Sequence, residues 1–288
     1  MDNNLVRRIL FAVVAIPLAL LLVWAGGWPL ALLVATIAVL GTRELFDIAE
    51  KQSVRPLRGL GLVLAAAGPL LVYASITRPD VHLWLAESWT YLGAAVVLVL
   101  LAEALRNRLP SERPLGAVAI TGFAVAYSGL LPSFLIGIRH GRFGMLSWAG
   151  TAMVFFPLVV TWVCDSAAMF GGRAFGGPKM APTISPGKTR SGGVAGLVGG
   201  VLIAPLFVYL VFPRVGIEIA ILPAAAMALA LSVVGQLGDL AESLFKREAG
   251  VKDSSTLIPG HGGVLDRFDS LYVILPTAAF CYHLLGML

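Results

Sequence analysis

Residues 219–238 read IAILPAAAMALALSVVGQLG, 20 consecutive positions without an Asp, Glu, Lys or Arg. A helix of about 20 apolar residues is long enough to cross the hydrocarbon core of a bilayer. The chain then continues as DLAESLFKR over residues 239–247, where charged side chains return at once. This pattern predicts a membrane-spanning helix that emerges into a polar segment, and it indicates the fold class of the whole chain.

The composition extends this prediction beyond one helix. Of the 288 residues, 58% are hydrophobic and 13% are charged, and the mean hydropathy is +0.88. Soluble domains carry about 25% charged residues, so these values exclude an ordinary cytosolic enzyme, a secreted disulfide scaffold and a disordered chain. Cys164 and Cys281 lie within apolar runs and form no CxxC pair, which fits small apolar side chains.

Apolar runs recur along the chain, so we expect an all-α, polytopic membrane protein with about nine transmembrane helices. The runs cover residues 9–25, 28–41, 59–76, 90–105, 116–138, 148–171, 193–212, 217–238 and 266–286. Arg7 and Arg8 precede the first run, as in a signal peptide, but no small-residue cleavage site follows it. We therefore expect this run to be retained as a span.

Basic residues divide unevenly between the alternate loops. If the N-terminus is cytoplasmic, 17 of the 21 Lys and Arg residues fall in cytoplasmic segments and 4 fall outside. The positive-inside rule then predicts an N-in, C-out protein of the cytoplasmic (inner) membrane. The net charge of +5 fits anionic lipid at the inner leaflet, and we expect no nucleic-acid partner.

Two cytoplasmic segments, 171–193 and 239–269, are longer than loops that only connect helices and are rich in Gly, Pro and charge. Both fall in the second half of the chain. We therefore expect residues 146–288 to hold the catalytic helices and residues 1–145 to form a scaffold.

Four polar side chains of the second segment share one helix face. Asp239, Glu242, Ser243 and Lys246 fall at i, i+3, i+4 and i+7 if the helix over 217–238 continues. Such a stripe fits either a charged helix end among lipid headgroups or part of a polar site.

Glycines and paired aspartates follow. The run PGHGG over residues 259–263 fits either a turn or a cradle whose backbone N–H groups approach an anion. Asp266 and Asp269 open the last apolar run at i, i+3, where one aspartate is explained as a helix cap. A second carboxylate on that face suggests a hard cation, and oxygen-only ligands favour Mg²⁺ over zinc.

The first segment follows Asp165, an acid near the end of an apolar run and so a functional candidate. Arg173 and the run SPGKT over residues 185–189 come next. They suit phosphate binding, and they also fit a flexible basic loop at the lipid surface. Cations and amides match phosphates, and carboxylates match the magnesium of a nucleoside triphosphate. The residues therefore point to phosphoryl or nucleotidyl transfer onto a lipid.

Two blocks of the sequence form a longer pattern. One comprises Ser243-Leu244-Phe245-Lys246-Arg247, Lys252-Asp253, Ser255, Ile258-Pro259, His261-Gly262-Gly263 and Asp266-Arg267-Phe268-Asp269. The other comprises Asp165-Ser166-Ala167-Ala168, Gly172-Arg173, Phe175-Gly176 and Ser185-Pro186-Gly187-Lys188-Thr189. Together they resemble the phosphatidate cytidylyltransferase (CDP-diacylglycerol synthase) family. The chain departs from the family pattern at Met169, where Tyr is common, and at Ser191, in a stretch where Glu-Gly is common.

The resemblance implies transfer of the cytidylyl group of CTP to phosphatidate, giving CDP-diacylglycerol and pyrophosphate with Mg²⁺. It also implies a homodimer and a cytoplasm-facing polar cavity open to membrane lipids. The implied catalytic residues are Asp239, Lys246, Asp266 and Asp269, and the three aspartates are the implied metal ligands. The implied substrate-binding residues are Asp165, Arg173, Ser185, Lys188, Thr189, Ser243, Arg247, Lys252, His261, Gly262, Gly263 and Arg267.

Two other functions remain open at this point. A CTP-dependent lipid kinase, such as a polyprenol kinase, would transfer the γ-phosphoryl group and release CDP. A transporter would carry charged residues in the middle of several spans, whereas the charges of this chain cluster at the ends of the apolar runs.

Overall fold

The computed structural model describes residues 13, 16–258 and 262–288. Seven helices within this part of the chain are long and apolar enough to cross a membrane. They cover Gly27–Glu50, Arg58–Thr77, Pro79–Asn107, Pro114–His140, Trp148–Phe175, Arg190–Val215 and Ile221–Glu248. The predicted class, an all-α polytopic membrane protein, is confirmed at this level.

Two of the nine predicted runs contain no helix of spanning length among the described residues. Residues 9–12, 14 and 15 of run 9–25 lie outside the described residues, and an apolar helix covers Ile16–Ala25 in the part that is described. Run 266–286 divides into α11 (Leu265–Phe268) and α12 (Leu271–Leu284), which has 14 residues. Asp269 and Ser270 lie between these helices.

The chain divides into two compact units. Unit 1 contains residues 26–137 and 249–267 together with the described residues up to Leu22. Unit 2 contains residues 23–25, 138–248 and 268–288. The residue that follows α10 in sequence, Ala249, therefore belongs to unit 1, and the chain returns to unit 2 at Phe268.

In unit 1, α2 (Gly27–Glu50) packs along α3 (Arg58–Thr77), and both contact a wide helical turn at Val125–Leu130. This turn joins α5 (Pro114–Ala124) to the stretch before α6 (Phe134–His140). Small residues allow the close approach, because a Cβ on Gly129 would lie 3.0 Å from the Cα of Ala65. Such contacts are typical of helices that associate within a bilayer.

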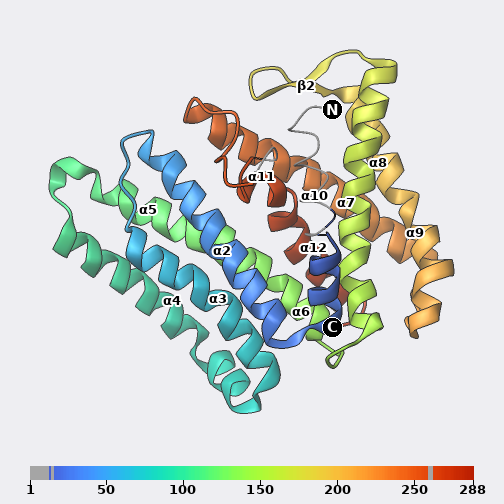
Figure 1. Cartoon of the computed structure of the whole chain (residues 1–288), viewed down its shortest axis with the longest axis horizontal. Coiled ribbons are helices and arrows are strands. Elements are labelled where there is room, and N and C mark those ends of the chain that lie inside the picture. The colour runs from blue at the N-terminus through green and yellow to red at the C-terminus, as the bar shows by residue number, and fades with distance from the viewer. Residues whose placement is uncertain (1–12, 14–15, 259–261) are drawn as a thin grey trace. The chain divides into compact units, whose positions relative to one another are not determined.

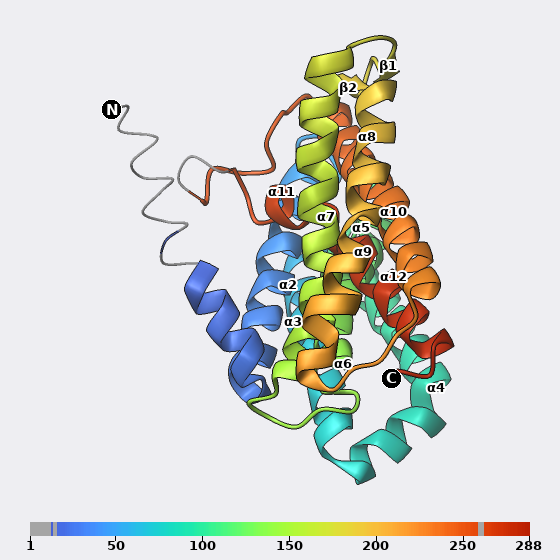
Figure 2. The same ribbon diagram turned by 90° about the vertical axis from the view of Figure 1, so that its right-hand side faces the viewer.

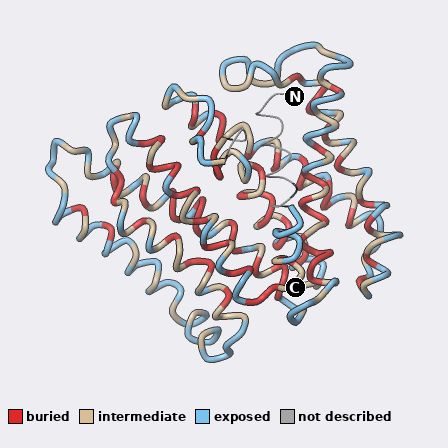
Figure 3. The backbone as a smooth tube through the Cα atoms, viewed as in Figure 1, coloured by how far each residue is buried: buried red, intermediate tan, exposed pale blue. Residues whose placement is uncertain are grey.

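The remaining long helix of unit 1, α4 (Pro79–Asn107), is mostly exposed. Only 6% of its apolar window is buried, compared with 56% for α2. Figure 3 shows this contrast as pale blue along α4 and red along α2. An apolar helix that other helices leave uncovered is suited to contact with lipid.

In unit 2, α7 (Trp148–Phe175) packs most extensively against α8 (Arg190–Val201), which continues towards α9 (Ile203–Leu206). Glycines permit this packing: a Cβ on Gly192 would lie 2.6 Å from the carbonyl oxygen of Ala168. The long helix α10 (Ile221–Glu248) contacts α7, α8 and α12. Figure 1 shows α7 and α8 running along one another, with α10 crossing α7 at an angle.

Segment 171–193 is ordered. Helix α7 extends to Phe175 and ends at Gly176, whose φ of +58° favours glycine. An antiparallel hairpin of β1 (Lys179–Ala181) and β2 (Ser185–Thr189) follows. The Thr189 hydroxyl then accepts a hydrogen bond from the Gly192 N–H (3.1 Å) and caps α8. Figure 2 shows the hairpin connecting the ends of α7 and α8.

Candidate active site

The polar stripe on α10 forms as the spacing predicts, because α10 is one continuous helix up to Glu248. Its members pair at i, i+4: the Ser243 hydroxyl donates to Asp239 Oδ1 (3.4 Å), and Lys246 Nζ lies 2.9 Å from Glu242 Oε1. The Glu242 side chain is fully buried and that of Lys246 is 10% exposed. Burying two charges costs free energy unless they are paired, so this pair fixes the position of the ammonium group.

A residue from the hairpin joins the stripe. Lys188 of β2 places Nζ 2.5 Å from Asp239 Oδ2, and both side chains are 30% exposed. The guanidinium of Arg247 donates to the carbonyl of Ile184, in the turn of the hairpin (3.2 Å). The hairpin is therefore attached to α10 at two points, and one of them presents a lysine to an aspartate.

Three carboxylates of unit 2 interact electrostatically. Asp165 of α7 faces the charges of both Asp239 and Asp269. Burial, followed by the nearby Asp239 carboxylate, raises the pKa of Asp269 to about 6. The backbone N–H of Ser270 donates to Asp269 Oδ1 (2.6 Å), and this hydrogen bond acts to lower the pKa of Asp269. Like charges held together in this way would be relieved by a bound cation.

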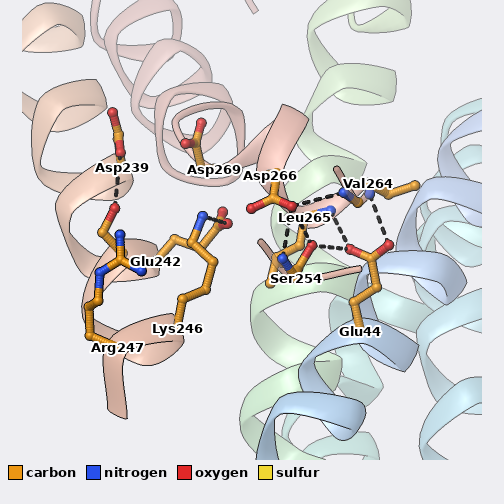
Figure 4. Close-up of polar contacts among 12 residues, drawn as sticks. Glu44, Asp239, Glu242, Lys246, Arg247, Ser254, Val264, Leu265, Asp266 and Asp269 are labelled. Atoms are coloured by element: carbon orange, nitrogen blue, oxygen red, sulfur yellow. Dashed lines mark hydrogen bonds and ion pairs between the residues drawn. The ribbon is translucent and has the colours of Figure 1, made fainter. Parts of the chain in front are cut away.

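Asp266 lies in unit 1, in a different setting. Its Oδ2 accepts hydrogen bonds from the Ser254 N–H (2.9 Å), the Ser254 hydroxyl (2.9 Å) and the Gly263 N–H (2.8 Å). Figure 4 shows Asp266 directed at Ser254, with Glu44 of α2 on the other side of that serine. At least one oxygen of Asp266 is therefore used to hold the polar segment of unit 1.

The two glycines before Val264 serve this same arrangement. Gly262 has a φ of +82°, and a Cβ there would lie 2.6 Å from Asp266 Oδ2. A Cβ on Gly263 would overlap the Ser254 hydroxyl and Glu44 Oε2. The anion that the Gly263 N–H approaches in the structure is thus a carboxylate of the protein. Whether Gly262 and Gly263 also contact substrate stays a prediction.

The other predicted substrate-binding residues differ in their surroundings. Thr189 is buried as the α8 cap, and Ser185 is half-buried in β2, opposite Ala181. Five of them have exposed side chains that a polar substrate can reach: Asp165, Arg173, Arg247, Lys252 and Arg267. His261 lies outside the described residues.

Sequence reasoning gave no role to two buried acids. Glu242 belongs to the predicted stripe, but only the folded structure shows that it is completely buried against Lys246. The sequence gives a weaker indication for Glu44. It follows Gly41 by three residues and precedes Ile48 by four, and all three lie on the buried face of α2. An acid on an otherwise apolar buried face indicates a polar partner from elsewhere in the chain.

The donor set of unit 2 fits Mg²⁺ by its chemistry, since it is anionic and offers only oxygen. Among the described residues, no three His, Cys, Asp or Glu side chains come close enough to hold one ion by themselves. Mg²⁺ is commonly bound by one or two carboxylates together with substrate phosphates and water. Asp239 and Asp269 are therefore suited to a metal that arrives with a triphosphate.

Comparison with known proteins gives a consistent result along the chain. Residues 6–285 match the model of the Cytidylyltransferase family. A phosphatidate cytidylyltransferase of Bacillus subtilis is 34% identical over 282 residues, covering 98% of this chain and 97% of the relative. A phosphatidate cytidylyltransferase of Brucella suis is 36% identical over 285 residues, covering 97% and 93%. One of Haemophilus influenzae is 36% identical over 229 residues, covering 77% and 75%.

Proposed function

The chain belongs to the cytidylyltransferase family, and we propose from this that it transfers the cytidylyl group of CTP to phosphatidate, releasing pyrophosphate. The products are CDP-diacylglycerol and pyrophosphate. The ion pair of Lys188 with Asp239 carries the proposal at the level of residues. It joins Lys188, in one sequence block that resembles this family, to Asp239, four residues before Ser243 begins the other block.

The reaction suits a site without a strong nucleophile of its own. The phosphate of phosphatidate attacks the α-phosphorus of CTP, and the bond from that phosphorus to the β-phosphate oxygen breaks. The second pKa of a phosphomonoester is about 6, so the attacking group is largely ionised at neutral pH. The protein has to position two anions and balance their charge.

Lysine and arginine side chains of unit 2 are suited to that task. Lys188 and Lys246 are held by Asp239 and Glu242, so their ammonium groups are positioned before a phosphate arrives. Arg247 lies beside the hairpin turn. Asp239 and Asp269 would hold Mg²⁺, which would supply charge stabilisation at the α-phosphoryl group and at the leaving pyrophosphate.

The membrane setting belongs to the same proposal. The uneven division of Lys and Arg between alternate loops supports an N-in orientation in the cytoplasmic membrane, with the chemistry at the cytoplasmic side. The exposed apolar surface of α4 is available for lipid or for a second copy in a homodimer.

Removal of divalent metal tests the Mg²⁺ assignment. Protein purified in detergent and treated with excess EDTA should form no CDP-diacylglycerol from CTP and phosphatidate, and added Mg²⁺ should restore the reaction. The Asp269→Asn variant should need a higher Mg²⁺ concentration for half-maximal rate, because it loses one anionic oxygen ligand. Full activity in excess EDTA would refute a metal-assisted reaction.

Two substitutions separate the possible roles of Asp266. Asp266→Asn keeps an oxygen that accepts from Ser254 and Gly263, whereas Asp266→Ala removes it. We expect Asp266→Asn to lose activity at least 100-fold with near-normal thermal stability, roughly the effect of one lost charge at a reacting phosphate. Asp266→Ala should in addition lose about 1–3 kcal/mol of stability, because buried donors are left without an acceptor. An active Asp266→Asn protein would leave Asp266 only the role of an anchor of the segment, with no part for its charge in the reaction.

A further inference from the structure

Glu44 of α2 is an acid with an unusual number of internal donors. The residue is 3% exposed. Its Oε1 accepts from the Ser255 hydroxyl (2.7 Å) and the Val264 N–H (2.9 Å). Its Oε2 accepts from the Ser254 hydroxyl (2.7 Å) and the Leu265 N–H (2.8 Å). Two hydroxyls and two backbone amides thus converge on one carboxylate.

These donors come from two separate stretches of the segment that follows α10. Ser254 and Ser255 form one stretch, and Val264 and Leu265, which directly precede Asp266, form the other. One carboxylate therefore ties two separate stretches of backbone to α2. Figure 4 shows the carboxylate of Glu44 directed at Ser254, Val264 and Leu265, with dashed lines ending on both of its oxygens.

Ser254 connects Glu44 to Asp266. Its hydroxyl oxygen lies 2.7 Å from Glu44 Oε2 and 2.9 Å from Asp266 Oδ2. A serine hydroxyl has one hydrogen, so it donates to one carboxylate at a time. The Ser254 N–H donates to Asp266 as well (2.9 Å). The orientation of the Asp266 carboxylate thus depends on where Glu44 holds Ser254.

We propose that Glu44 is a positioning residue that fixes the orientation of Asp266 for the cytidylyl transfer. This inference rests on the proposed function. Glu44 holds the backbone immediately before Asp266 through Val264 and Leu265, and it holds the side-chain partner of Asp266 through Ser254. An apolar residue would fill the same place on α2, but it would take away the acceptor of the Ser255 hydroxyl and of the Val264 and Leu265 amides. Groups that act in a reaction need such supporting contacts to keep their geometry.

Glu44→Gln tests the proposal, because it keeps the shape of the side chain and replaces one accepting oxygen by an NH₂ group. That group faces either the Leu265 N–H or the Val264 N–H, donor against donor. We expect kcat to fall roughly 10- to 100-fold, as for other groups that orient a reacting residue, with little change in KM for CTP. Hydrogen–deuterium exchange at Val264 and Leu265 should become faster, while the amides of α3 keep their protection.

Glu50→Gln is the matched control. It makes the same chemical change on the same helix, at a side chain that pairs with Arg58, and it should leave both kcat and the exchange at Val264 and Leu265 unchanged. If Glu44→Gln does not fold in detergent, Ser255→Ala removes one of the four donors and should produce the same two changes at smaller size.

The results of these experiments test the positioning role of Glu44 separately from the proposed cytidylyl transfer. Normal kcat together with normal exchange at Val264 and Leu265 in Glu44→Gln, or in Ser255→Ala where that variant replaces it, would overturn the positioning role. Loss of protection throughout α2 and α3, in step with the loss of activity, would also overturn it in favour of a purely structural role. If the wild-type protein forms no CDP-diacylglycerol, the proposed function fails, whereas the exchange comparison still decides whether Glu44 holds this backbone.

Discussion

Asp239→Asn is expected to lower kcat by roughly 10³-fold, because it removes several kcal/mol of charge stabilisation at the reacting phosphates. Asp239 is central in unit 2: it pairs with Lys188, accepts from Ser243 and interacts with the charge of Asp269. The asparagine keeps the size of the side chain and an oxygen acceptor for Ser243. Loss of the charge would therefore affect a cation and Lys188 more than the packing of α10.

Initial rates of CDP-diacylglycerol formation at saturating CTP and phosphatidate measure this effect, and thermal unfolding in detergent shows whether the variant is folded. Glu248→Gln is the control, since it removes a carboxylate charge from the exposed end of the same helix. We expect its rate to stay within about twofold of wild type, as for a surface substitution. A folded Asp239→Asn protein with near-normal kcat would contradict the role given to this acid.

Gly263→Ala is expected to reduce both stability and activity. The added methyl group would overlap the Ser254 hydroxyl and Glu44 Oε2, which are hydrogen-bonded to each other and buried. Neither group can move without losing contacts to Val264, Leu265 or Asp266. Overpacking a filled interior costs about 1–3 kcal/mol, and a displacement of Asp266 by about 1 Å would lower the rate roughly 100-fold.

Gly59→Ala is the matched control for this change. Gly59 lies in α3, in the same unit, and a Cβ there meets nothing within 4 Å. We expect it to be neutral or slightly stabilising, because alanine favours a helix more than glycine does. Thermal unfolding and activity of both variants in one detergent provide the comparison. Wild-type behaviour of Gly263→Ala would show that the segment is not held as closely as the structure has it.

The sequence predicted the helical membrane fold well because the signal is local. The run 219–238 has no charged residue, and its composition alone requires a span. The stripe on α10 was equally accessible, since residues at i and i+4 meet wherever a helix continues. These features depend on no contact that is distant in sequence.

The hairpin and the role of Glu44 could not be predicted from such local patterns. The strand Ser185–Thr189 contains a proline and a glycine, which are rare in strands, so SPGKT predicts a phosphate-binding segment or a flexible basic loop and gives no signal for a strand. Glu44 is 210 residues before its partner Ser254. Only the folded chain brings that acid to the amides of Val264 and Leu265, directly after the run PGHGG that fits an anion cradle or a turn.

The distribution of label from CTP tests the central claim most directly. Wild-type protein in detergent is incubated with phosphatidate, Mg²⁺ and CTP labelled with ³²P at either the α- or the γ-phosphate, and lipid and aqueous products are separated. The account predicts that α-label enters the lipid as CDP-diacylglycerol and that γ-label appears as pyrophosphate. Entry of γ-label into lipid, with α-label left in aqueous CDP, would identify a lipid kinase and contradict the account.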